Sequence, residues 1–227
     1  MFVKFAQAVR SAKTFFFLAV LAALCFNNWI LGFFLNAKLF SADGSVSELS
    51  SAGHPHAVVF RSLDIISGLL LMALAVWWHK SRQSRERSGI LFWGSLVLGV
   101  SNLVDALLPL GCSEVLNSAC KIPISLSLHH LVLPSHAYSS AGVGLGYFLL
   151  PLGGWIYSQN QHMKAFRLVS QIVFAINLIL FASILREYAE VGITVKASGL
   201  IQQFQMTAIG VWLIAWGYFY KNKALRV

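Results

Sequence analysis

The stretch DALLPLGCSEVLNSACKIPISLSLHHLVLPSHAYSS, from Asp105 to Ser140, contains several potentially reactive or metal-binding side chains of this 227-residue chain. It contains an aspartate at the end of an apolar block, two of the three cysteines and three of the seven histidines. On either side, the chain consists of apolar blocks of about 20 residues, the length that spans a hydrocarbon core about 30 Å thick. The stretch therefore predicts a loop between membrane helices, with the other helices packed around it.

The composition supports a membrane protein. Only 11% of the residues are charged and 57% are hydrophobic, whereas soluble proteins carry about 25% charged residues. The apolar blocks predict an all-α, polytopic bundle of six transmembrane helices that forms a single membrane domain over residues 1–227. The predicted helices cover residues 14–36, 57–78, 89–110, 135–157, 168–187 and 199–220.

The positive charges predict the orientation of this bundle, because cytoplasmic loops of membrane proteins collect Lys and Arg. With the N-terminus inside, the inner segments hold twelve basic residues: Lys4, Arg10, Lys13, Lys80, Arg82, Arg85, Arg87, Lys164, Arg167, Lys221, Lys223 and Arg226. The outer segments hold five: Lys38, Arg61, Lys121, Arg186 and Lys196. Both termini are therefore expected in the cytoplasm. The net charge of +9 reflects this topology rather than binding to nucleic acid.

The same orientation places Cys112 and Cys120 outside. In an oxidising compartment they are expected to form a disulfide that closes the loop, with two free thiols as the alternative. Their spacing is not C-x-x-C, so a redox-active pair is not expected. Cys25 lies within the first predicted helix, where a small apolar residue packs well.

Polar side chains gather toward the outer ends of the predicted helices. Because ionisable groups in spanning segments normally face a bundle interior or a water-filled cavity, this pattern predicts a polar cavity that opens outward and contacts lipid. The expected ligand-binding residues are Arg61, Asp64, Asp105, His130, His136 and Gln202. Two narrower interpretations stay open. Arg61 and Asp64 are spaced to form an ion pair on one helix, and Asp105, near the C-terminal end of a helix, needs a partner such as Arg61, a histidine or a metal.

The histidines offer a metal site as a further alternative. His129, His136 and Asp105 or Asp64 could supply three zinc ligands and leave a position open for water. In that case Asp105, His136 and Asp64 are the candidate catalytic residues. No HxxxH or HExxH motif is present, and the competing interpretation is a set of hydrogen-bonded histidines without metal.

Three segments resemble a family of bacterial and archaeal membrane proteins, domain of unknown function 998. They are SELSSAGHPHAVVFRSLDIISGLLL at 47–71, the stretch from Asp105 through SLSLHHLVLPSH, and GLIQQFQMTAIGVWLIAWG at 199–217. The resemblance implies a multi-pass protein of a bacterial or archaeal plasma membrane, with no established activity to carry over. The residues at family positions are Glu48, Pro55, Asp64, Asp105, Cys112, Cys120, His130 and His136. The gap from His130 to His136 is longer than the usual family spacing.

Three functions compete at this point. The first is binding of a small molecule, a lipid headgroup or a partner protein in the outward cavity. The second is metal-assisted hydrolysis or transfer on a lipid or lipid-linked substrate, which requires Asp105 and His136 to converge on one point. The third is transport, which the lack of ionisable groups in the inner halves of the helices disfavours. The sequence carries no phosphate-binding loop and no serine-nucleophile elbow.

Overall fold

The computed structural model describes residues 2–35, 45–81, 89–112, 135–160, 163–191 and 198–224. Within these ranges every regular element is helical, which confirms the predicted all-α class. The α-helices are α1 (Phe2–Phe26), α2 (Gly32–Leu35), α3 (Ala57–Lys80), α4 (Gly89–Leu107), α5 (Ser135–Asn160), α6 (Lys164–Val191) and α7 (Ser198–Ala224). Two short 3-10 helices, η1 (Asn28–Leu31) and η2 (Val46–Ser50), complete the set.

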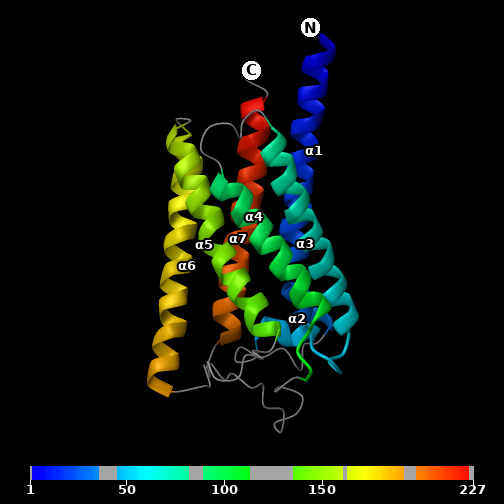
Figure 1. Ribbon diagram of the computed structural model, residues 1–227, viewed down its shortest axis with the longest axis vertical. Helices are drawn as coiled ribbons and strands as arrows, with labels where there is room; N and C mark the ends of the chain where they lie inside the picture. Colours follow the sequence, from blue (N-terminus) through cyan, green and yellow to red (C-terminus); the bar gives the residue numbers. More distant parts are fainter. Residues whose placement is uncertain are drawn as a thin grey trace.

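The six long helices run side by side and close into a ring. Each packs against its neighbour in the chain, from α1 and α3 through α4, α5 and α6 to α7, and α7 returns to pack against α1. The beginning of α1 and the end of α7 lie at the same end of the bundle (Figure 1). The 3-10 helix η2 lies at the opposite end, where α4 ends and α5 begins.

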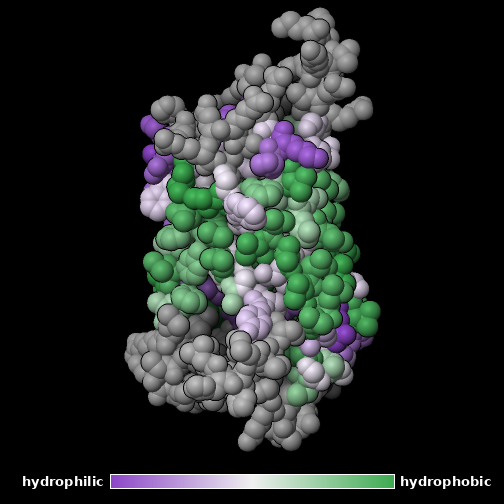
Figure 2. All heavy atoms as spheres, viewed as in Figure 1, coloured by the Kyte–Doolittle hydropathy of each residue, from purple (hydrophilic) through white to green (hydrophobic). Residues whose placement is uncertain are grey.

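Several of these helices can cross a membrane. Three described helices are long and apolar enough, at Ala57–Lys80, Gly89–Leu107 and Lys164–Ser183, and a fourth span results if Ser11–Phe26 and Asn28–Leu35 count as one. Apolar residues cover the middle of the face shown in Figure 2. The chain is therefore a multi-pass membrane protein. Helices α5 and α7 have the necessary length but carry more polar residues than the other spans, so the count of six goes beyond this finding.

The first predicted helix, 14–36, is corrected by the structure. Helix α1 already begins at Phe2 and ends at Phe26, and the segment that follows is bent away from it by 49°. The bend occurs at two asparagines whose side chains compete for hydrogen bonds with the backbone. Asn27 donates to the carbonyl of Ala23 at 2.9 Å, and Trp29 donates to the Asn27 side chain at 3.2 Å. The Ala23 carbonyl also accepts the backbone N–H of Asn27 at 3.1 Å, so the side-chain amide adds a second hydrogen bond at the last turn of α1.

Candidate functional site

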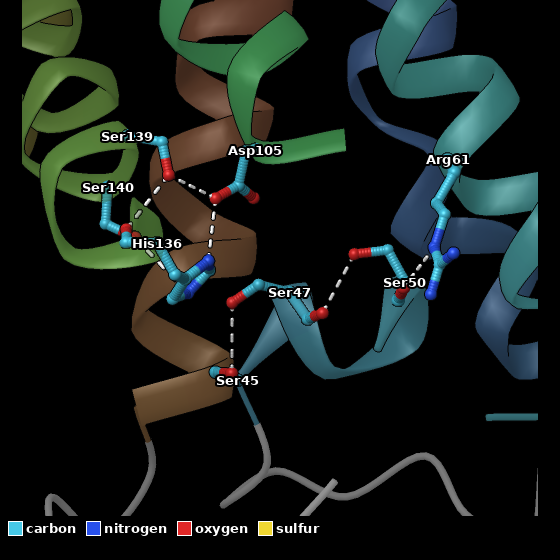
Figure 3. Close-up of polar contacts among 8 residues, drawn as sticks. All are labelled: Ser45, Ser47, Ser50, Arg61, Asp105, His136, Ser139 and Ser140. Atoms are coloured by element: carbon cyan, nitrogen blue, oxygen red, sulfur yellow. Dashed lines mark hydrogen bonds and ion pairs between the residues drawn. The ribbon is translucent and has the colours of Figure 1, made fainter. Parts of the chain in front are cut away.

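The candidate site lies at the end of the bundle away from the termini, where α4 ends and α5 begins (Figures 1 and 3). Its central contact joins Asp105 of α4 to His136 of α5. The His136 Nδ1 lies 2.7 Å from the Asp105 Oδ1, and each side chain is 18% exposed. The Nδ1 atom makes no regular hydrogen bond in this geometry, so the contact is a short approach of the two side chains that becomes an ion pair when the imidazole is protonated. Among the partners expected for Asp105, a histidine is the one that the structure places there.

Ser139 supports the same carboxylate from one turn further along α5. It is 3% exposed, and its Oγ lies 2.5 Å from the Asp105 Oδ1 and 2.9 Å from the backbone carbonyl of His136. A hydroxyl has a single hydrogen to donate, and an ionised acceptor makes the stronger bond. The Ser139 hydroxyl is therefore held by Asp105. Among the described residues, the second carboxylate oxygen of Asp105 takes part in no such contact.

Ser140 extends the cluster on the exposed side. Its Oγ lies 3.4 Å from the Nε2 of His136, so the two ring nitrogens of His136 face different partners, as Figure 3 shows. The spacing of one helical turn between residues 136 and 140 brings both side chains to one face of α5. His136 thus sits between a carboxylate and an accessible hydroxyl, an arrangement in which the imidazole can take a proton at Nε2.

A second carboxylate, Asp64 of α3, is held next to the bend in the first span. The side-chain amide of Asn28 donates to the Asp64 Oδ1 at 2.6 Å and lies 3.3 Å from the carbonyl of Phe60. From α4, Asn102 donates to the backbone carbonyl of Asp64 at 2.9 Å. Asp64 and Asp105 thus lie on the adjacent helices α3 and α4 at this end of the bundle.

Arg61 and Gln202, two other predicted ligand-binding residues, contact the segment around η2. Arg61 donates from Nε to the carbonyl of Ser50 at 2.6 Å, and the side-chain oxygen of Gln202 accepts the Val46 N–H at 2.8 Å. The described residues contain no ion pair between Arg61 and Asp64, so that interpretation is wrong. Arg61 and Gln202 fasten η2 to α3 and α7, and the structure does not bring them into contact with Asp105 or His136.

Several predicted site residues fall elsewhere. His129, His130 and Cys120 lie outside the described residues, so the disulfide with Cys112 and the zinc set that includes His129 stay predictions. Within the part of the chain that the structure describes, no group of three or more His, Cys, Asp or Glu side chains is arranged to hold a metal ion. The pair of Asp105 and His136 alone supplies two ligands, and a third would have to come from outside these ranges.

Ser139, Ser140 and Asn28 were not predicted as site residues. The signal for the two serines was present, because residues 136, 139 and 140 share one face of a helix. The signal for Asn28 was a pair of amides inside an apolar block, where each polar group needs a partner. In both cases the sequence does not show which neighbouring helix packs against that face.

Comparison with known protein families gives one match. The family described as "Protein of unknown function (DUF998)" matches residues 17–218, in agreement with the resemblance of the three sequence segments. No curated protein and no solved structure matches the chain.

Proposed function

The chain belongs to the DUF998 family of proteins of unknown function, and we propose that it is a six-span membrane protein that binds a polar ligand at Asp105 and His136. The observation that carries this proposal is the contact of 2.7 Å between two partly exposed ionisable side chains on different helices. Ionisable groups are costly in spanning segments and are retained where they serve a site. A ligand can reach this pair because each side chain keeps 18% of its surface exposed.

The charges of the site favour one class of ligand. One carboxylate oxygen of Asp64 and one of Asp105 make no contact among the described residues, whereas the Oδ1 atom of each is engaged. Such acceptors suit a ligand that donates hydrogen bonds, and a cationic donor makes the strongest ones. We therefore assign the site to a membrane lipid whose headgroup carries an ammonium group, rather than to an anionic headgroup.

Lipid retention tests this assignment. Purified protein is mixed with phosphatidylethanolamine and phosphatidylglycerol of equal acyl chains, and the bound lipid is identified by native mass spectrometry. We expect the wild type to retain phosphatidylethanolamine preferentially. Asp105→Asn should weaken that preference about tenfold or more, since it removes a charge-assisted hydrogen bond. Ser158→Ala should retain the preference. It is a control on α5, the helix of His136, where the Ser158 Oγ donates to the Trp155 carbonyl at 2.8 Å. Equal retention of both lipids by the wild type would contradict the assignment.

The proposed topology has both termini in the cytoplasm and the site on the outer face. It is supported by the positive charges and by the common end at which α1 begins and α7 ends (Figure 1). Reporter fusions test it. Alkaline phosphatase fused after residue 43 should be active, because it folds only outside the cytoplasm, whereas fusions after residues 84 and 227 should be inactive. Green fluorescent protein at the same positions should give the reverse pattern. An active phosphatase at residue 227 would overturn the orientation.

Transport has less support than binding. Within the predicted spans, the Asp, Arg and His side chains that the structure describes are Arg61, Asp64, Asp105 and His136, and these belong to the end of the bundle that holds the site. Toward the other end the described core is aromatic and apolar, with Phe15, Trp78, Trp212 and Trp216 buried. A path for a polar solute through that part would need polar lining.

A further inference from the structure

We infer that Ser140 is a nucleophile, activated by His136 and Asp105, which cleaves carboxylic esters at the outer membrane interface. This inference rests on the proposed function, because it uses the same site and gives it a chemical reaction. The observation behind it is the order of the contacts, with the hydroxyl of Ser140 on one ring nitrogen of His136 and the carboxylate of Asp105 on the other.

The distances fit this relay in a protein without bound substrate. The carboxylate contact is short, at 2.7 Å between Asp105 Oδ1 and His136 Nδ1. The hydroxyl contact is longer, at 3.4 Å between Ser140 Oγ and His136 Nε2. Hydrogen bonds between nucleophile and base are often loose before substrate binds and shorten in the complex. A carboxylate beside Nδ1 favours the tautomer that carries its hydrogen on Nδ1, which leaves Nε2 to accept a proton.

The neighbouring serines have different roles. Ser139 is buried, and Asp105 holds its hydroxyl at 2.5 Å, so it cannot reach a substrate in this arrangement. Ser140 is exposed and faces the accessible side of the imidazole, as Figure 3 shows. Ser140 is accordingly the nucleophile and His136 the base, whereas Asp105 and Ser139 are positioning residues.

The helix that carries both reactive groups favours the chemistry. His136 is the second residue of α5 and Ser140 the sixth, since the helix begins at Ser135. Both side chains therefore lie in the first two turns of the helix, next to its positive end. The same end favours the negative charge that develops on a carbonyl oxygen during attack. Asp105 then balances the proton that His136 takes up.

The surroundings indicate the class of ester. Asp105 lies two residues before the end of α4 at Leu107, or about 3 Å from that end along the helix axis. Large apolar side chains stand exposed beside the site, with Leu107 at 60%, Leu108 at 51% and Tyr138 at 55%. Acyl esters of membrane lipids present a carbonyl just below the headgroup and an apolar chain below that. The substrate class is therefore an acyl ester of a membrane lipid, with water as the second substrate.

The reaction balances with these groups alone. The Ser140 Oγ attacks the ester carbonyl carbon as its proton passes to the His136 Nε2. The tetrahedral intermediate then breaks its bond to the alcohol oxygen, which leaves with the proton from His136. Water attacks the acyl-serine ester, and His136 takes one proton from the water. Collapse breaks the bond to Oγ, releases the carboxylic acid and returns the proton to Ser140.

A fluorophosphonate probe tests the nucleophile without a known substrate. The Ser140 Oγ would form a bond to phosphorus, fluoride would leave, and the proton would go to His136. We expect wild-type protein in native membranes to carry the adduct on Ser140, located by peptide mass spectrometry. Ser140→Ala should carry no adduct. His136→Gln should react at least about 100-fold more slowly than the wild type. Ser158→Ala should react like the wild type. An unlabelled wild type, or an adduct on another serine, would overturn the inference.

The positioning role of Asp105 has a separate readout. Asp105→Asn should slow labelling strongly, and Asp105→Glu should recover part of the rate, whereas a purely structural role would give parallel losses of rate and thermal stability. The inference and the proposed function can fail separately. If the wild type retains phosphatidylethanolamine but carries no adduct, only the inference that Ser140 is a nucleophile is overturned. Wild type that carries the adduct on Ser140 but retains both lipids equally overturns only the assigned headgroup.

Discussion

Replacement of Trp78 by alanine is expected to lower the free energy of unfolding by about 3 kcal/mol, the lower part of the range for buried Trp-to-Ala changes. Trp78 is 1% exposed. Its ring packs at 4.9 Å from Tyr157, 5.4 Å from Trp216 and 5.9 Å from Tyr220. It thereby joins α3 to α5 and α7. Each aromatic pair contributes about 0.5–1.5 kcal/mol beyond the contact area.

Two effects hold the expected loss to the lower part of that range. Helices that separate in a membrane still have apolar lipid around them, so packing rather than exclusion from water drives their association. In addition, the Trp78 indole N–H is buried with no acceptor among the described residues, and its removal relieves that cost. Unfolding in mixed micelles with increasing sodium dodecyl sulfate measures the change. Trp93→Ala is the matched control, since Trp93 is 59% exposed on α4. Equal losses in both variants would contradict the role of Trp78.

Most of the helices could be predicted from the sequence because the signal is local. The predicted helix at 57–78 lies within α3, Ala57–Lys80, and the helix at 89–110 overlaps α4, Gly89–Leu107. Long apolar blocks and the polar segments between them suffice for this. The break after Phe26 was not predicted, because the residues on both sides of Asn27 and Asn28 are as apolar as the rest of the block. Closure of the ring by α1 and α7 depends on contacts between distant segments, which no local pattern specifies.

The candidate site was predicted in part, for a related reason. An aspartate near the C-terminal end of an apolar helix needs a partner, and this indicated a histidine as one of the candidates for Asp105. The selection of His136 together with Ser139 and Ser140 depends on which face of α5 meets α4. Polar and apolar residues are mixed around α5, which also contains Pro151, so its sequence does not mark that face. The partner of Arg61 was wrongly predicted because a spacing of three residues permits an ion pair with Asp64. In the structure Arg61 donates instead to the carbonyl of Ser50 in η2, a segment that is not adjacent to it in the helix.

Replacement of Gly99 by leucine is expected to be the most disruptive single change near the site, with a loss of about 3 kcal/mol of stability. A Cβ at Gly99 would lie 2.8 Å from the carbonyl oxygen of Gly68, and a Cβ at Gly68 would lie 2.7 Å from the carbonyl oxygen of Gly99. Because both obstacles are backbone atoms of neighbouring helices, no rotamer change relieves the contact. Helices α3 and α4 would have to move apart.

This movement would reach the site through two hydrogen bonds that flank the glycines. On one side Ser95 donates to the carbonyl of Leu71 at 3.2 Å, and on the other Asn102 donates to the carbonyl of Asp64 at 2.9 Å. Gly99→Leu should therefore also abolish the preference for phosphatidylethanolamine and slow the reaction of Ser140 with the fluorophosphonate. Gly89→Leu is the control on the same helix, because a Cβ at Gly89 has no atom within 4 Å. If Gly99→Leu matched Gly89→Leu in stability, lipid preference and labelling, the close approach of α3 and α4 would have no part in holding the site together.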